Sequence, residues 1–247
     1  MPAVLETRGI AKRFGGLMAV ARVDFTLDEG ELRSLIGPNG AGKTTFFNLL
    51  TGHLRADEGT ILFRGRDVTR LPVYSRARLG IARKYQSPTV FDELTVFDNI
   101  RVAVRGSSSP FALFFRRFDP EPDEHAERLL DKVRLGKKRN WPASKLSHGE
   151  RQWLEIAMVL GSKPRLLLLD EPTAGMTPAE TRQTARLLKE IASDTSTVVI
   201  EHDIKFVREI ASKITVLHKG AILAEGLLED IAGNDTVRKV YLGREDV

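Results

Sequence analysis

Residues 37–44 restrict the fold of this 247-residue chain more than any other feature. They read Gly-Pro-Asn-Gly-Ala-Gly-Lys-Thr, which matches the pattern G-x-x-x-x-G-K-[ST] in full. Residues 32–36 before the loop, three of them apolar, predict a short strand, and residues 44–50 predict a helix that continues from the loop. A strand, a glycine-rich loop and a helix in this order predict a loop that wraps phosphate groups.

The residue types in the loop suit that task. Glycines let backbone N–H groups turn towards phosphate oxygens, where Cβ atoms would obstruct them. We expect Lys43 to place its charge on the β and γ phosphates of a nucleotide, and the Thr44 hydroxyl to be a ligand of Mg²⁺. The residues expected to bind the nucleotide here are Gly37, Pro38, Asn39, Gly40, Ala41, Gly42, Lys43, Thr44 and Thr45.

Two acidic residues follow a segment of four consecutive leucines, within residues 165–169. Continuous leucines are typical of a central parallel strand, and ligands bind at the carboxyl ends of such strands. Asp170 is therefore expected to hold Mg²⁺ through water, and Glu171 to orient and deprotonate an attacking water. Two adjacent acids indicate little alone, but together with the loop of residues 37–44 they predict nucleotide hydrolysis.

A third motif, the signature segment of residues 146–150, reads Leu-Ser-His-Gly-Glu and opens a predicted helix. Ser147 is a natural N-cap, and Glu150 three residues later completes a capping box. One interpretation is simply a well-capped helix. The other interpretation is that the N-terminus of this helix holds a phosphate. One chain cannot easily aim two helix N-termini at one nucleotide from opposite sides, so a nucleotide between two subunits would be contacted by one N-terminus from each.

The predicted elements change in kind along the chain. Strands are predicted at residues 4–14, 19–27 and 60–63, with a turn at 64–67. Helical spacing marks residues 94–104, 122–133 and 149–160. From residue 164 strands and helices alternate, which predicts a parallel sheet, with strands at 165–169, 196–201 and 213–217, helices at 178–192 and 204–211, and a hairpin turn at Lys219-Gly220.

Composition excludes several classes. The chain has no cysteine, so it has no disulfide framework and no thiolate metal site. A net charge of +5 is too small to indicate nucleic acid. No stretch approaches the roughly 20 apolar residues of a membrane span, and the start lacks a secretory signal, so we expect a cytoplasmic protein.

Residues 111–117, apolar with a basic end, are either a helix packed within its own subdomain or a surface for a partner.

These motifs come in the order found in ATP-binding-cassette (ABC) ATPases, which the chain resembles over essentially its whole length. The resemblance implies an α/β P-loop NTPase fold with a RecA-like parallel-sheet core, an N-terminal antiparallel β subdomain and an inserted α-helical subdomain. A single domain is then expected over residues 1–247. Its core and β subdomain would occupy residues 1–87 and 163–247, and the helical signature subdomain residues 88–162.

Three further roles come from the resemblance alone. Phe14, before Gly15-Gly16, matches the aromatic residue that stacks on adenine. Gln86 matches the glutamine that touches Mg²⁺ and senses the γ-phosphate. His202 matches the switch histidine near the γ-phosphate.

The signature segment departs from the family pattern at His148, where glycine is usual, and at Glu150, where glutamine is usual. Ser147 and Gly149, which the family aims at the γ-phosphate bound by the opposite subunit, are intact. Ser147, Gly149 and Glu150 are therefore expected to contact ATP. Residues 172–177 lack the common Ser-Ala-Leu-Asp loop. Their Ala-Gly-Met sequence is similar to that of ATPases of branched-chain amino-acid and amide uptake systems, and Ser-His-Gly followed by Gln-Trp-Leu-Glu-Ile is most similar to the urea branch.

The resemblance implies an ATP-hydrolysing, Mg²⁺-dependent subunit of an importer of a branched-chain amino acid, urea or an amide. Its partners would be a second, identical or paralogous ATPase subunit, two transmembrane permease subunits and, indirectly, a periplasmic solute-binding protein, with no nucleic acid. It would lie peripherally on the cytoplasmic face of the inner membrane. An exporter ATPase is the nearer alternative. A soluble ABC ATPase is the other, although the stretch between Lys43 and Ser147 is too short for long coiled coils.

Overall fold

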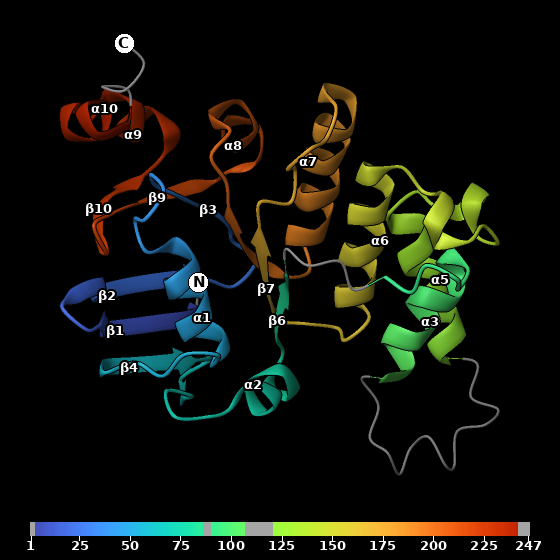
Figure 1. Cartoon of the computed structure of the whole chain (residues 1–247), viewed down its shortest axis with the longest axis horizontal. Coiled ribbons are helices and arrows are strands. Elements are labelled where there is room, and N and C mark those ends of the chain that lie inside the picture. The colour runs from blue at the N-terminus through green and yellow to red at the C-terminus, as the bar shows by residue number, and fades with distance from the viewer. Residues whose placement is uncertain (1–2, 86–89, 107–120, 242–247) are drawn as a thin grey trace. The chain divides into compact units, whose positions relative to one another are not determined.

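The computed structural model describes residues 3–85, 90–106 and 121–241 of the chain (Figure 1). The chain forms two compact units. The first unit comprises Met1–Arg83, Arg165–Glu171 and Leu188–Val247, and the second comprises Lys84–Pro164 and Pro172–Leu187.

An antiparallel sheet in the first unit has the strand order β2-β1-β4-β5. Its long strands contain the two segments predicted at residues 4–14 and 19–27, and Phe14 pairs with Leu17 across a tight Gly15-Gly16 turn. Residues 64–67 were expected to form only a turn, but Arg66 and Asp67 pair with Phe63 and Leu62, so the turn is shorter than predicted. The strands are β1 (Ala3–Phe14), β2 (Leu17–Asp28), β4 (Glu58–Phe63) and β5 (Arg66–Asp67).

A six-stranded sheet has the order β10-β9-β3-β8-β7-β6. Strand β3 is parallel to both β8 and β9, and β7 is parallel to β8, as the alternating pattern predicts. Every residue of β3, β7 and β8 is buried, which is typical of parallel strands covered on both faces. The strands are β3 (Leu32–Ile36), β6 (Ile81–Lys84), β7 (Leu166–Asp170), β8 (Ser196–Ile200), β9 (Lys213–His218) and β10 (Ala221–Gly226).

Helix α1 (Lys43–Thr51) connects the two sheets through the main core of the first unit. Phe46, Phe47, Leu49 and Leu50 are fully buried among side chains of both sheets. A smaller core cluster lies under the C-terminal helices. The other helices of this unit are α2 (Val73–Leu79), α8 (Ile204–Ile210), α9 (Leu228–Gly233) and α10 (Asp235–Tyr241).

The second unit is helical. Its helices α3 (Val96–Gly106), α5 (Glu121–Lys132) and α6 (His148–Leu160) pack against one another, close to the three helical segments predicted there. It also holds residues 178–187 of α7 (Pro178–Ala192), whose bounds match the predicted helix. The segment 111–117 lies outside the described residues. Within the described ranges no helix has the length and apolar character needed to cross a membrane. The predicted α/β fold, with a parallel core sheet, an antiparallel sheet and a helical part, is confirmed.

Candidate active site

The glycine-rich loop lies between β3 and α1, as predicted. Gly42 precedes α1 with a φ angle of 103°, which a residue with a side chain rarely adopts. A Cβ atom there would also lie 2.3 Å from the Ala19 carbonyl oxygen, so backbone of β2 closes against the loop. The loop conformation therefore requires glycine at this position.

Lys43 directs its ammonium group into the loop. Its Nζ donates hydrogen bonds to the carbonyl oxygens of Gly37, at 2.6 Å, and Pro38, at 3.1 Å. Burial lowers the pKa of Lys43, while the nearby carboxylates of Glu171 and Asp170 act in the opposite direction. The positive charge of Lys43 is thus held inside the glycine-rich loop, where a phosphate group is expected to bind.

A pocket of about 650 Å³ lies over this loop. Its described lining residues all belong to the first unit. It brings together residues that were predicted from three separate segments: the glycine-rich loop, the aromatic residue that ends β1, and the two acids at the end of β7. The lining residues are Phe14, Leu17, Met18, Ala19, Asn39, Gly40, Ala41, Gly42, Lys43, Thr44, Thr45, Asp170, Glu171, Ile200 and Lys219.

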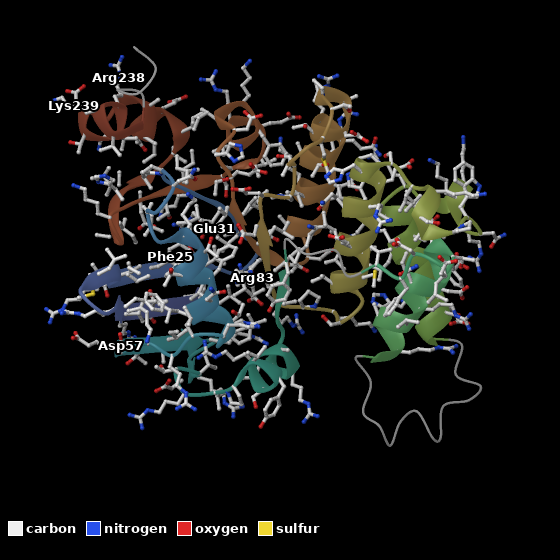
Figure 2. All side chains as sticks on the ribbon, viewed as in Figure 1. Phe25, Glu31, Asp57, Arg83, Arg238 and Lys239 are labelled. Carbon is white, nitrogen blue, oxygen red and sulfur yellow. The ribbon has the colours of Figure 1, made fainter. Side chains whose placement is uncertain are left out.

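Asp170 ends β7 in a buried ion pair that the sequence did not predict. Arg83, at the end of β6 and labelled in Figure 2, donates from Nη2 to Asp170 Oδ2 at 2.8 Å. The two side chains are only 5% and 3% exposed. Arg83 also donates to Asn48 of α1 at 2.6 Å and lies over the Phe47 ring. The guanidinium group therefore fixes one carboxylate oxygen of Asp170.

Glu171, the next residue, has a strained backbone. Its φ angle is +47°, in the left-handed region that costs about 1 kcal/mol or more for a residue other than glycine. Its amide N–H still donates to Ile200 of the neighbouring strand at 3.0 Å. The Nδ1 atom of His202 lies 3.7 Å from Glu171 Oε1 and 3.9 Å from Glu201 Oε2. The structure thus brings His202 next to the expected base.

Phe14 contributes an apolar surface to the pocket. Its ring is 46% exposed at the end of β1 and lies 5.7 Å from the ammonium group of Lys12. Lys219, in the β9–β10 turn, lines the same pocket and was not predicted to do so. A single lysine in a hairpin turn gives no sequence signal for such a position.

The signature segment belongs to the second unit. Ser147 is the N-cap of α6, and its side chain and that of Glu150 form both bonds of the predicted capping box. Lys138 donates to both oxygens of Glu150, at 2.6 and 2.7 Å. Burial would raise the pKa of Glu150, but the bonds from Lys138 and the Ser147 backbone outweigh it and lower the pKa.

Gln86 lies outside the described residues, so its role stays a prediction.

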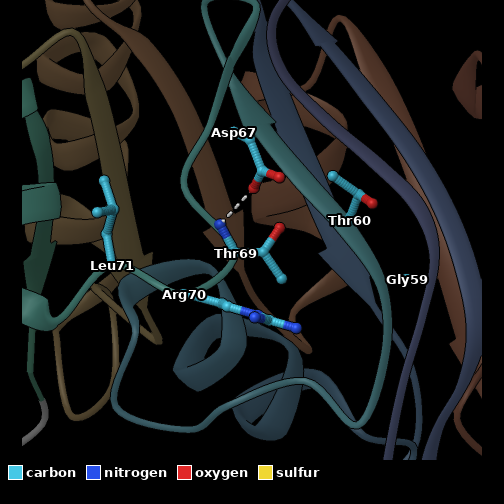
Figure 3. A pocket seen from close by; sticks show the side chains of 6 residues that line it. All are labelled: Gly59, Thr60, Asp67, Thr69, Arg70 and Leu71. Atoms are coloured by element: carbon cyan, nitrogen blue, oxygen red, sulfur yellow. Dashed lines mark hydrogen bonds between the residues drawn. The ribbon is translucent and has the colours of Figure 1, made fainter.

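A second pocket, of about 480 Å³, lies on the antiparallel sheet (Figure 3). In it Asp67 accepts a hydrogen bond from the Thr69 backbone N–H at 2.8 Å. None of the predicted site residues lines it. We therefore place the candidate active site at the glycine-rich loop.

The glycine-rich loop lies between strand β3 and helix α1, and two acidic residues lie at the end of β7 in the same sheet. This combination defines a P-loop nucleotide-binding protein. The model of the ABC transporter family matches residues 20–174. The chain is 41% identical over 249 residues to the high-affinity branched-chain amino acid transport ATP-binding protein BraF of Pseudomonas aeruginosa, covering 97% of this chain and 98% of that protein. It is 40% identical over 250 residues to the corresponding protein LivG of Escherichia coli, with the same coverage.

Two solved structures extend the comparison. A nucleotide-free ATP-binding cassette from an ABC transporter has a TM-score of 0.83, with 29% identity over 97% of this chain and 98% of that one. The ADP conformation of an ATP-binding cassette of an ABC transporter has a TM-score of 0.85, with 29% identity over 98% of this chain and 100% of that one. The chain belongs to the ABC transporter family and is one of the family's ATP-binding subunits, which are ATPases.

Proposed function

We propose that this chain binds and hydrolyses ATP to drive an importer of branched-chain amino acids or a related small polar solute. The observation that carries the proposal is the single pocket in which Lys43, Asp170 and Glu171 meet the glycine-rich loop. The relatives BraF and LivG, named as branched-chain amino acid transport ATP-binding proteins, support uptake of that solute class. Import, as opposed to export, is proposed from the similarity of residues 172–177 to the ATPases of uptake systems. Urea is the narrower proposal from the sequence of residues 147–156, and an amide is the one from residues 174–176.

In this proposal the phosphates of ATP replace the carbonyl oxygens that Lys43 now contacts. Backbone N–H groups of residues 37–45 and the N-terminus of α1 complete the phosphate site. Thr44 and Asp170 both line the pocket, and oxygen donors such as a hydroxyl and a carboxylate suit Mg²⁺, which retains several waters. These residues, together with Gln86, would hold Mg²⁺, which neutralises charge on the phosphates.

Glu171 would act as the general base towards the attacking water. Glu171 lines the same pocket, while the carboxylate of the adjacent Asp170 is held by Arg83. The two acids therefore have different surroundings, which supports one role for each. His202, close to Glu171, would contact the γ-phosphate and keep the base oriented.

Ser147, Gly149 and Glu150 would serve ATP bound by a second ATPase subunit, identical or paralogous. The described lining of the pocket already supplies one helix N-terminus, that of α1. The N-terminus of α6, with its capping residue, is a second site suited to an anion. Two chains would then enclose two ATP molecules.

Replacement of Phe14 by alanine should weaken ATP binding and leave the phosphate contacts intact. Stacking of a base on an aromatic ring contributes about 1–3 kcal/mol, so ATP affinity should fall about 5- to 150-fold. Phe14→Tyr retains the ring and should bind ATP nearly as well as the wild type. Affinity can be measured by calorimetry with ADP and ATP. If Phe14 only completes the end of β1, its loss would lower the melting temperature and leave ATP affinity unchanged.

The transport role places the subunit on the cytoplasmic face of the inner membrane, with two permease subunits and, indirectly, a periplasmic solute-binding protein. Uptake of labelled leucine and of labelled urea should be compared in cells that lack the gene. We expect the wild-type chain to restore uptake of one solute, and the Glu171→Gln variant to restore none. Normal uptake of both solutes without the gene would reject the importer assignment.

A further inference from the structure

The carboxylate of Glu180 lies on the signature segment. Glu180 is in the first turn of α7, and its Oε1 atom is 3.1 Å from the Ser147 hydroxyl. Its other oxygen, Oε2, accepts from the backbone N–H and the hydroxyl of Thr177, both at 2.9 Å. These bonds from Thr177 are the largest influences that hold the pKa of Glu180 below its usual value, with a smaller one from Ser147. All three residues belong to the second unit.

The same carboxylate lies against Gly149. A Cβ atom on Gly149 would be 2.5 Å from both Cδ and Oε1 of Glu180. The loop before α7 is also attached to the start of α6, because Nε2 of His148 lies 2.9 Å from the Ala174 carbonyl oxygen. An anionic group therefore covers both residues that are proposed to receive the γ-phosphate of the neighbouring subunit.

This contact occupies the only proton of the Ser147 hydroxyl. A carboxylate can only accept, so Ser147 must donate to Glu180. The Ser147 oxygen in turn accepts from the Glu150 backbone N–H at 3.3 Å. In this arrangement Ser147 has no proton left for a phosphate oxygen, and a negative charge already lies near the N-terminus of α6.

We propose that Glu180 is a positioning residue that holds Ser147 and Gly149 in a resting arrangement and competes with the γ-phosphate of the opposite subunit. Docking of ATP then requires the Ser147 hydroxyl to exchange its hydrogen bond to Glu180 for one to a phosphate oxygen, with the proton remaining on Ser147. The proposal rests on the role of the signature segment given under the proposed function. It adds an internal anion that restrains closure of the two ATPase subunits until ATP is bound.

Glu180 has a structural role from which this one must be separated. Thr177 and Glu180 form a capping box for α7, since the Glu180 backbone N–H also donates to the Thr177 hydroxyl at 3.3 Å. Glutamine serves equally well at this position of a capping box. In Glu180→Gln the amide oxygen can accept from Thr177, which turns the amide N–H groups towards Ser147. The cap is then kept, while the Ser147 hydroxyl becomes free to donate to a phosphate oxygen.

The test measures ATP-dependent dimerisation of the full chain by sedimentation velocity. All proteins carry Glu171→Gln, so that ATP is retained. Adding Glu180→Gln should lower the concentration of half-dimerisation about 5- to 150-fold, as expected for the loss of one competing hydrogen bond at each of the two sites of the dimer. ATP affinity of the dilute monomer and the melting temperature without nucleotide should not change. The matched control is Glu190→Gln, which removes the same charge from an exposed position on α7 and should leave dimerisation unaltered.

The outcomes are distinct. An unchanged or weaker dimer with Glu180→Gln would overturn the proposal, and together with a lower melting temperature it would leave Glu180 as a cap alone. If Glu171→Gln forms no dimer with ATP although it binds ATP as a monomer, the shared site between two copies is wrong. The role of Glu180 would then be rejected with it.

Discussion

Glu171→Gln should bind ATP as tightly as the wild type and hydrolyse it about 10²- to 10⁴-fold more slowly, the usual cost of losing a general base. Glutamine retains the size of the side chain and cannot accept the proton of the attacking water. Phosphate release at saturating ATP and Mg²⁺ measures the rate, and equilibrium dialysis measures binding. A closed, ATP-bound dimer should accumulate because the step that dissociates it is blocked.

Lys43→Ala is the matched comparison for Glu171→Gln. Charge-assisted hydrogen bonds contribute about 1.5–3 kcal/mol, so ATP affinity should fall about 10- to 150-fold. The two variants thus separate binding from chemistry within one pocket. Phosphate release at the wild-type rate by Glu171→Gln would refute the assignment of the base.

Gly149→Asp should abolish ATP hydrolysis by the assembled ATPase subunits while the dilute monomer still binds ATP. Aspartate adds bulk and a negative charge at the N-terminus of α6, where the γ-phosphate of the opposite subunit would dock. The nearest neighbour of the new side chain is the flexible end of Glu180, so the helix can keep its fold. Gly149→Ala adds the Cβ without the charge, and a smaller loss of activity is expected.

Mixing two inactive chains tests whether the site is shared. A dimer of one Gly149→Asp chain and one Lys43→Ala chain has one site with both substitutions and one with neither. Partial recovery of ATPase activity on mixing is the expected result. If Gly149→Asp alone blocks ATP binding by the monomer, and the wild-type rate stays proportional to chain concentration at high dilution, hydrolysis needs no second subunit.

Local patterns predicted much of the fold. The glycine-rich loop, the leucine strand before Asp170 and the helix of residues 178–192 each have a regular spacing within a short stretch. Strands β6 and β10 and helices α2, α9 and α10 were not predicted. They are short, and several lack the periodicity that distinguishes a helix or strand from a loop.

The site was predictable where a motif lies within consecutive residues, and less so where distant residues meet. The pocket unites the loop of residues 37–45 with Asp170, Glu171 and Phe14. Arg83 pairs with an acid 87 positions away, and Glu180 contacts a serine 33 positions away. No local spacing encodes such pairs, because they depend on the packing of elements that are remote in sequence. The buried Arg76 donates to carbonyl oxygens at the end of α1, and this contact could not be predicted from the sequence for the same reason.

The left-handed backbone of Glu171 sets two selective pressures against each other at one position. Glycine would adopt this φ angle without strain, so it would relieve the native backbone while removing the carboxylate proposed to act as the general base. Selection for thermal robustness alone would therefore favour loss of the acid, and only the need for turnover retains it. Laboratory evolution of a heat-resistant variant should for this reason be carried out under continuous demand for the transported nutrient.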